Sequence, residues 1–189
     1  MHLIDIGNKN KIQCYAEIGV SKGETVLRVC EVLEPNSSLY IFDFEEKVDL
    51  VCEKINNAFP GKFKVCKFGN SYKTRDSYCW SLINLMRKDP GRKFFDYVYL
   101  DGSHDLVIDG LAFFLIDLML KDRGCIEFDD YDWTFLRSPT VNPSRHPKTQ
   151  EYYTEDQFSL PHIKLIVDHL VKANPHYKEI VHNRVYQKL

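Results

Sequence analysis

Short apolar runs alternate with longer segments of helical period along most of this chain, and this alternation constrains the fold more than any other feature. The apolar runs predict strands over residues 13–19, 39–44, 62–68, 96–101 and 124–130. The segments between them predict helices over residues 23–33, 47–59, 77–88 and 107–120. Nearly continuous apolar strands separated by helices are typical of a parallel sheet covered on both faces. The pattern therefore predicts a doubly wound, Rossmann-like α/β fold with a mostly parallel sheet.

The last third of the chain departs from this alternation. Residues 131–158 are rich in Pro, Ser, Thr and aromatic residues without a clear period, and a segment of that length predicts a substrate lid. A helix is expected over 161–173. Two alternating runs then flank His182-Asn183, which predicts a C-terminal antiparallel hairpin added to the sheet. We expect a single domain over residues 1–189, either complete in itself or one module of a longer protein.

The amino-acid composition indicates which kinds of molecule the protein can bind and where it is located. The chain has 189 residues, of which 44% are hydrophobic, so it should fold around a core of its own. Its net charge is -2 without a polybasic run, which disfavours nucleic acid and anionic membrane surfaces and favours a small molecule. Six cysteines form no CxxC pair, and we interpret them as buried free thiols. No signal peptide or membrane-spanning run is evident, so we expect a cytoplasmic protein.

The turn after the first predicted strand carries an ExGxxxG motif, formed by Glu17, Gly19 and Gly23. Ligands of open parallel sheets bind at the carboxyl ends of the strands. Two glycines at such an end allow a tight turn and a close approach of a ligand to backbone amides. Because any turn between a strand and a helix can contain glycines, this motif by itself is explained equally well by a purely structural turn.

The ends of the second and third strands add polar and aromatic groups. Asp43 follows Glu17 by 26 positions, a spacing that places an acid beside the ribose of a nucleoside. Phe44 could then lie against an adenine face, and Asn70 or Ser71 could bind the edge of the base. The alternatives are that Asp43 only begins a solvated helix and that Asn70 belongs to a simple turn.

The ends of the fourth and fifth strands are acidic. Asp101 ends one and Asp129-Asp130 end the other. Three carboxylates in one crevice repel each other unless a cation or protons lie among them. An oxygen-rich site of this kind suits Mg²⁺, with Mn²⁺ or Ca²⁺ as alternatives. The competing interpretation is a turn and helix cap, because Asp is common where strands end.

Together these motifs resemble the class I S-adenosylmethionine (SAM)-dependent methyltransferases over residues 13–133. The likeness is greatest to the metal-dependent small-molecule and sugar O-methyltransferases of the macrocin and mycinamicin type, and more distant to catechol O-methyltransferase. An aspartate at position 130, where the catechol enzyme has asparagine, favours an aliphatic diol. The segments that carry the resemblance are AEIGVSKGET, LYIFDFEE, FGNS, YLDGSH and FDDYDW.

The resemblance implies a role for each matching position. Glu17, Gly19 and Gly23 would line the methionine and ribose part of the cofactor, and Asp43 would bind the ribose hydroxyls. The remaining cofactor positions are Phe44, Asn70, Ser71 and Asp101, and the implied metal ligands are Asp101, Asp129 and Asp130.

The implied reaction is direct displacement of a methyl group onto a hydroxyl of a small-molecule or glycan acceptor, with the metal lowering the hydroxyl pKa. His104 and Asp132 are the candidate general bases. Relatives carry segments before the first strand, whereas about a dozen residues precede it here, so we expect the 131–158 segment to cover the acceptor. Its candidate contact residues are Trp133, Phe135, Arg137, Arg145, His146, Tyr152 and Tyr153.

Two other functions compete with this interpretation. Asp130-Tyr131-Asp132 forms a DxD that could hold a metal and a nucleoside diphosphate, as in a glycosyltransferase. The ExGxxxG motif argues against that class. The third candidate is a noncatalytic cofactor-binding module that keeps the motif without turnover.

Overall fold

The chain folds around one seven-stranded sheet in the part that the computed structural model describes, residues 2–3 and 12–189. The strand order is β3-β2-β1-β4-β5-β7-β6. The first five strands are parallel, and β7 pairs antiparallel with both β5 and β6, which confirms the predicted fold class. The strands are β1 Cys14–Ile18, β2 Ser38–Phe44, β3 Lys64–Asn70, β4 Phe95–Leu100, β5 Leu120–Phe128, β6 Tyr177–Val181 and β7 Val185–Lys188.

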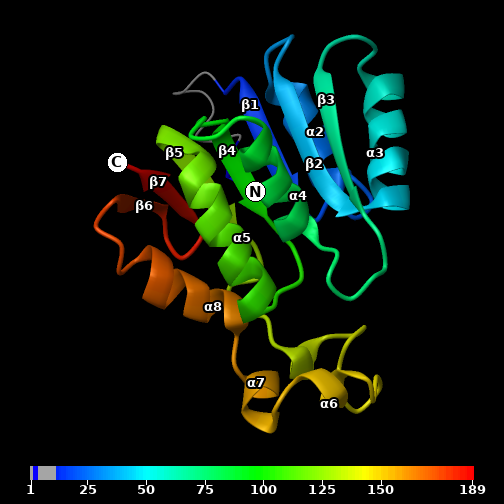
Figure 1. Ribbon diagram of the computed structural model, residues 1–189, viewed down its shortest axis with the longest axis vertical. Coiled ribbons are helices and arrows are strands. Elements are labelled where there is room, and N and C mark those ends of the chain that lie inside the picture. Colours follow the sequence, from blue (N-terminus) through cyan, green and yellow to red (C-terminus); the bar gives the residue numbers. More distant parts are fainter. Residues whose placement is uncertain (1, 4–11) are drawn as a thin grey trace.

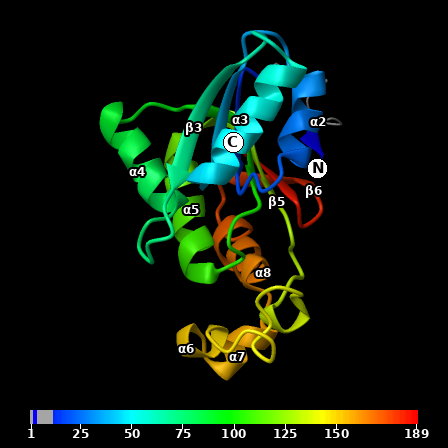
Figure 2. The ribbon, with the colours of Figure 1, turned by 90° about the vertical axis from the view of Figure 1, so that its right-hand side faces the viewer.

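Helices cover both faces of the sheet (Figures 1 and 2). Two helices, α2 Glu24–Val32 and α3 Glu45–Ala58, cover one face. The other face is covered by α4 Tyr78–Lys88, α5 Leu106–Met119 and α8 His162–Ile166, which continues into the π-helical turn η2 Val167–Val171. Successive strand residues point to opposite faces, so Tyr15 packs in the core under α2 and α3 while Ala16 packs in the core under α4 and α5. The apolar strands are thus buried on both sides, as their sequences predict.

Strand β5 differs from its predicted extent. It begins at Leu120, directly after α5, whereas the apolar run predicts a start at residue 124. The pairing of β4 with β5 shifts register between Phe95 and Tyr97, and Arg123 has a φ of 62°. Asp122 and Arg123 in the first half of the strand are charged and exposed. This half therefore lacks the apolar pattern from which a strand is predicted.

The 131–158 segment forms a lobe below the carboxyl edge of the sheet (Figure 1). It contains three short helices, η1 Phe135–Arg137, α6 Thr149–Tyr152 and α7 Glu155–Ser159. Phe135 is buried at its centre, with ring centroids 4.3 Å from Tyr153 and 5.3 Å from His162. An aromatic core therefore organises the segment that lacks a period in sequence, and Phe135 and Tyr153 belong to this core.

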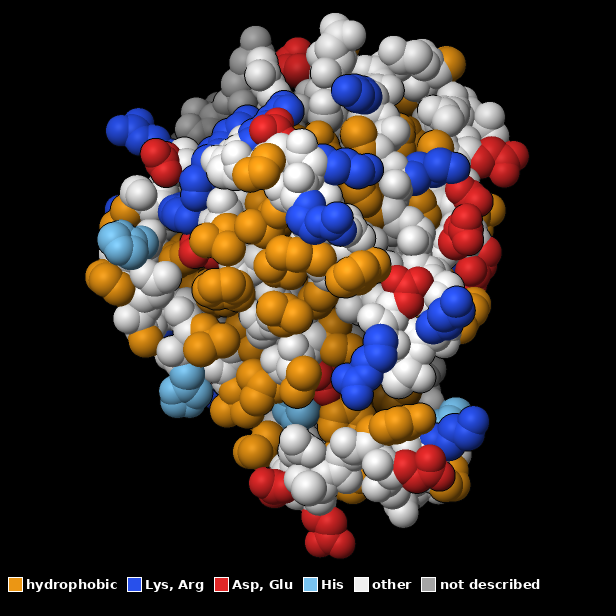
Figure 3. All heavy atoms as spheres, viewed as in Figure 1, with side chains coloured by type: hydrophobic (Ala, Val, Ile, Leu, Met, Phe, Trp, Pro, Cys, Tyr) orange, Lys and Arg blue, Asp and Glu red, His pale blue; other side chains and the backbone are white. Residues whose placement is uncertain are grey.

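Apolar side chains gather on the outer surface of α4 and α5 (Figure 3). The exposed members include Trp80, Leu111 and Phe114. No helix in the described part of the chain is long and apolar enough to cross a membrane. All six cysteines are free thiols. Four of them are buried as expected, whereas Cys52 and Cys66 are partly exposed.

Candidate functional site

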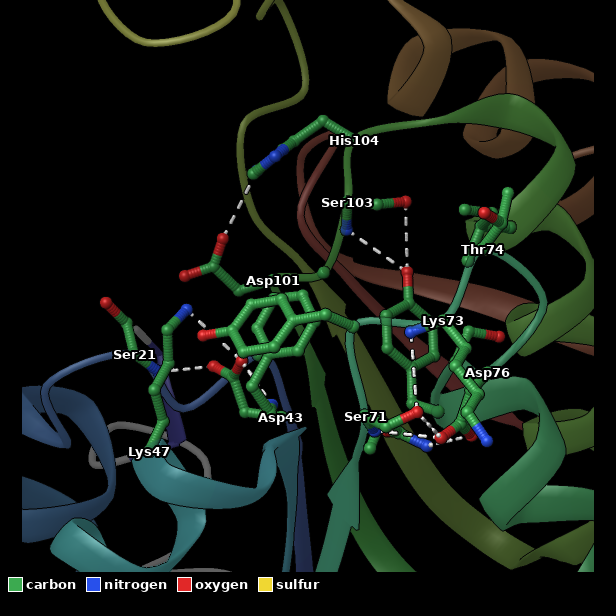
Figure 4. A pocket seen from close by; sticks show the side chains of 18 of the residues that line it. Ser21, Asp43, Lys47, Ser71, Lys73, Thr74, Asp76, Asp101, Ser103 and His104 are labelled. Atoms are coloured by element: carbon green, nitrogen blue, oxygen red, sulfur yellow. Dashed lines mark hydrogen bonds and ion pairs between the residues drawn. The ribbon is translucent and has the colours of Figure 1, made fainter.

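A hollow of about 750 Å³ opens at the carboxyl ends of β1 to β4 (Figure 4). Strands β1 and β4 are neighbours at the centre of the sheet, where the strand order reverses, and ligands of such sheets bind at that point. The structure thus brings together most of the cofactor residues predicted from sequence, although they come from four different turns. Those that line the hollow are Gly19, Asp43, Phe44, Asn70, Ser71 and Asp101, together with the candidate base His104.

The turn after β1 requires glycine at position 19. Gly19 has a φ of 86°, and a Cβ there would lie 1.9 Å from the carbonyl oxygen of Asp101. Its amide donates a hydrogen bond of 2.8 Å to the carbonyl of Phe42. The absence of a side chain therefore lets this backbone pass between the ends of β2 and β4. Gly23 has another role, because it precedes α2 with a φ of 82°, outside the lining of the hollow, and a Cβ there would lie 2.9 Å from Val51.

Glu17 is buried beneath this turn, only 1% exposed, and does not line the hollow. Its Oε2 accepts a hydrogen bond of 2.6 Å from the hydroxyl of Tyr15. Burial raises the pKa of Glu17 to about 8, and the nearby Asp101 and Asp43 add to the increase. The side chain is therefore mostly protonated at neutral pH. Instead of the expected direct contact with a cofactor, the structure gives Glu17 a supporting position under the turn.

The carboxylate of Asp43 is held in place at the end of β2. Its Oδ2 accepts from the amide of Ser21 at 2.8 Å, and its Oδ1 accepts from the amide of Phe44 at 2.7 Å. Lys47, one helical turn further on, lies 3.2 Å from Oδ1. Each oxygen keeps a lone pair that can accept from a ligand. Sequence analysis missed Lys47, although its spacing of four residues from Asp43 is a usable signal.

Asn70 and Ser71 are oriented by Asp76, which sequence analysis also missed. The side-chain amide of Asn70 donates to Asp76 at 3.2 Å, and both the amide and the hydroxyl of Ser71 donate to the same carboxylate. The Oδ1 of Asn70 is buried and has no hydrogen-bond partner among the described residues. A buried acceptor without a partner at the wall of a hollow fits a ligand that brings a donor, such as an amino group.

An aromatic pair forms another part of the wall. The rings of Phe44 and Tyr72 are stacked, with centroids 4.3 Å apart and an interplanar angle of 17°. The hydroxyl of Tyr72 donates a hydrogen bond to Glu46. Stacked rings beside a polar wall suit a planar heterocycle.

Three groups that could bind a metal meet at the mouth of the hollow: Asp101, His104 and Asp130. One ligand atom from each lies within 4.8 Å of the others. The Nε2 of His104 is 3.3 Å from Oδ1 of Asp101 and 2.9 Å from Oδ2 of Asp130. This nitrogen is buried, and its N–H is poorly aligned with either oxygen for a hydrogen bond. The three ligand atoms are therefore close enough together to hold one metal ion.

The charge state of this cluster follows from its geometry. Burial by itself lowers the pKa of His104, but Asp101 and Asp130 outweigh that effect and raise the pKa to about 10. Burial raises the pKa of Asp101, and the neighbouring His104 opposes that increase. Without a cation, His104 is therefore a protonated imidazole between two carboxylates at neutral pH and has no free lone pair to accept a proton.

Asp129 lies apart from this cluster. It forms an ion pair with Arg184 from the β6–β7 turn, and its Oδ2 accepts a hydrogen bond of 2.6 Å from the hydroxyl of Tyr99. Although burial opposes it, these contacts lower the pKa of Asp129. The set of three carboxylates expected from sequence is thus replaced by Asp101, His104 and Asp130. No short-range signal could reveal Arg184, which is 55 positions away along the chain.

Asp132 also points elsewhere. Its side chain is 74% exposed and lies 3.9 Å from Lys164. Asp130 and Asp132 therefore have different ion-pair partners, although both line the hollow beside Asp130 that is described below. Arg145, His146 and Tyr152 of the 131–158 segment are exposed and line neither that hollow nor the one at the carboxyl ends of β1 to β4.

Solved structures share the fold of this chain at low sequence identity. An O-methyltransferase from Bacillus cereus, in complex with SAH, is 13% identical, with a TM-score of 0.60 over 99% of this chain and 78% of that one. An SAH-bound methyltransferase from Podospora anserina is 15% identical, with a TM-score of 0.56 over 98% of this chain and 74% of that one. The O-methyltransferase TomG from Streptomyces achromogenes, in complex with SAM, is 15% identical, with a TM-score of 0.53 over 79% of this chain and 64% of that one. No protein-family model and no curated protein matches the sequence.

Proposed function

We propose that this chain is a SAM-dependent O-methyltransferase that acts on a hydroxyl of a sugar, glycan or similar small molecule. One observation carries the proposal: a hollow with the features of a nucleoside site opens directly onto the Asp101–His104–Asp130 cluster. The shared fold of solved methyltransferases, two of them bound to SAH, supports the same conclusion. The hollow would bind the cofactor, and methyl transfer to the acceptor would take place beside the cluster.

The residues of the hollow fit SAM. Asp43 keeps acceptor capacity on both oxygens for the two ribose hydroxyls, and the unpartnered Oδ1 of Asn70 fits the amino group of adenine. The stacked rings of Phe44 and Tyr72 would form an aromatic wall beside the base. When bound, SAM supplies an electrophilic methyl group. The bare backbone at Gly19 leaves room at the centre of the hollow, where a side chain would collide with Asp101.

The mouth of the hollow fits a divalent cation. Asp101 and Asp130 provide carboxylate oxygens, which suit Mg²⁺ or Mn²⁺, and His104 provides an imidazole nitrogen, which suits a transition metal better than Mg²⁺. Among Mg²⁺, Mn²⁺ and Ca²⁺, Mn²⁺ matches this mixed donor set best. When bound, the cation lowers the pKa of a hydroxyl that coordinates it.

The residues of the cluster would then orient the acceptor, and a carboxylate beside the cluster would receive its proton. In the reaction, the acceptor oxygen forms a bond to the methyl carbon while the bond from that carbon to sulfur breaks, and the hydroxyl proton passes to a base. His104 is held protonated when the cation is absent and is a ligand when it is present. The base is therefore a carboxylate, and because Asp130 would also be a metal ligand, the candidate is Asp132, which lines the second hollow next to Asp130. Positioning of the acceptor supplies much of the rate.

Labelled methyl transfer tests the proposal. We expect SAM with a labelled methyl group to label hydroxylated acceptors in a mass-spectrometric panel, and EDTA to abolish the labelling. Asp130→Asn should reduce turnover strongly while leaving SAH affinity nearly unchanged, because Asp130 does not line the cofactor hollow. SAH binding without any labelled product would instead favour the noncatalytic module. A thermal shift with UDP and none with SAH would favour the glycosyltransferase.

A further inference from the structure

A second hollow, of about 550 Å³, lies beside the metal-binding cluster. It is bounded by the end of β5, by the first part of the 131–158 segment and by the β6–β7 turn. Asp130 lines this second hollow and His104 lines the first, and the contact of 2.9 Å between their side chains joins the two. A molecule bound in the second hollow is therefore next to the cluster without occupying the nucleoside site.

Two arginines line the second hollow, and only one of them is neutralised. Arg184 is paired with Asp129 at the base of the β6–β7 turn. The guanidinium of Arg137 forms no ion pair and no hydrogen bond with the residues that the structure describes. An unpaired arginine is common on a protein surface, but the exposed Arg137 lines a hollow together with Tyr131 and Trp133. A guanidinium in that setting is suited to bidentate binding of an oxyanion.

The aromatic walls are fixed by their own contacts. The ring of Trp133 lies 4.9 Å from the ring of His104 and 5.0 Å from that of Phe135. The hydroxyl of Tyr131 donates to Asp168 at 2.8 Å, and Lys164 lies over the ring. Rigid aromatic surfaces with a few polar groups are typical of sites that hold the face of a ring-shaped ligand.

The charge of the lining limits which oxyanion can bind. Asp130 and Asp132 contribute negative charge to the same hollow as Arg137 and Arg184. Because Arg184 is already paired with Asp129, Arg137 is the arginine left for a ligand. Asp130 contacts His104 and Asp132 lies 3.9 Å from Lys164, so Arg137 is the charge of the lining that has no partner among the described residues. Its single positive charge matches the one negative charge of a carboxylate better than the nearly two of a phosphate monoester. The balance favours a monoanion.

We infer that the second hollow binds the methyl acceptor and that this acceptor is a hydroxylated ring carrying a carboxylate, as in a uronic acid or a hydroxylated aromatic acid. Arg137 binds the carboxylate, Trp133 and Tyr131 contact the ring, and a hydroxyl of the ring reaches the cluster at Asp130. The role of the ligand as an acceptor rests on the proposed function, whereas the affinity of the hollow for carboxylates does not.

Matched pairs of compounds test this inference. Each pair contains an acid and its neutral counterpart, such as glucuronate with glucose and dihydroxybenzoate with dihydroxybenzyl alcohol, and a sugar phosphate forms a third arm. Calorimetry with SAH present should show binding of the acid. The neutral counterpart and the sugar phosphate should bind much more weakly. Arg137→Gln should weaken acid binding by about tenfold or more, because a hydrogen bond to a charged group is lost. Arg145→Gln is the control, since Arg145 lies in the same segment but outside the hollow.

The outcomes distinguish the carboxylate specificity of the second hollow from the proposed methyltransferase activity. Tighter binding of the neutral or phosphorylated member, or an unchanged affinity in Arg137→Gln, would overturn the carboxylate assignment even if SAM is turned over. Binding of acids that is lost in Arg137→Gln, together with no SAH binding, would uphold the hollow and refute the methyltransferase. With both properties intact, labelled SAM should give a higher kcat/KM for the acid of each pair, and Arg137→Gln should remove that preference.

Discussion

The Nε2 of His104 lies 2.9 Å from the Oδ2 of Asp130, and both residues have left-handed backbones, with φ values of 57° and 50°. Residues other than glycine rarely adopt this conformation, and such positions cluster where a site requires them. The two turns after β4 and β5 thus present an imidazole and a carboxylate to each other. This contact joins the hollow proposed for the cofactor to the hollow proposed for the acceptor.

The first prediction concerns this pair. In protein stripped of divalent cations, Asp130→Asn should lower the pKa of His104 from about 10, because one of the two negative charges that favour the imidazolium is removed. An NMR titration of the imidazole measures the change. Asp132→Asn is the control, since Asp132 faces Lys164 and should leave the titration nearly unchanged. Equal pKa values in the wild type and Asp130→Asn would show that the contact is not formed in solution.

The second prediction concerns the ribose. Asp43→Asn keeps the shape of the side chain but removes the charge that would accept from two hydroxyls. Hydrogen bonds to a charged group contribute about 1.5–3 kcal/mol each, so SAH should bind roughly ten- to a hundredfold more weakly by calorimetry. Glu53→Gln, on the exposed surface of α3, should bind SAH like the wild type. Normal affinity in Asp43→Asn would remove Asp43 from the cofactor site.

The third prediction compares two glycine-to-alanine variants. It distinguishes the cost of a positive φ from the cost of a steric collision of the new Cβ. Gly19→Ala and Gly61→Ala both place a side chain at a positive φ, 86° and 70°, but only the Cβ at position 19 meets other atoms. Gly61→Ala should cost about 1–2 kcal/mol of unfolding free energy, as expected for a left-handed residue. Gly19→Ala should cost clearly more and should also weaken SAH binding. Urea unfolding measures both costs, and similar values would mean that the turn after β1 adapts freely.

The fourth prediction follows from the raised pKa of Glu17. Its ordinary value is 4.5 and its value in the folded protein is about 8, so folding holds the proton more tightly than the unfolded chain does. The stabilising contribution is complete below pH 4.5 and is lost as the pH rises towards 8. The loss is roughly 4–5 kcal/mol at about 1.4 kcal/mol for each pKa unit. Glu17→Gln should lack this loss, so the difference in unfolding free energy between the two proteins should change between pH 5 and pH 8. A constant difference would contradict the burial of a protonated Glu17.

The sequence by itself determined the sheet and the location of the hollow at the carboxyl ends of β1 to β4. Strands that are apolar on both faces must be covered by helices, and the carboxyl ends of parallel strands meet at one edge whatever the details of packing. Gly19, Asp43 and Asn70 therefore reach the same hollow because of topology alone. Local patterns carry this information, since strand period and turn residues are short-range properties.

The tertiary structure alone decided which side chains meet at the mouth. Asp129 and Asp130 are adjacent in sequence, yet Asp129 turns to Arg184 on the C-terminal hairpin while Asp130 turns to His104. Consecutive side chains leave the chain in different directions, so neighbours in sequence acquire different partners, and those partners are supplied by packing between distant elements. The same holds for Arg137, whose place beside Asp130 depends on the aromatic core around Phe135. Charge pairing and burial act through space, and a one-dimensional pattern does not contain those distances.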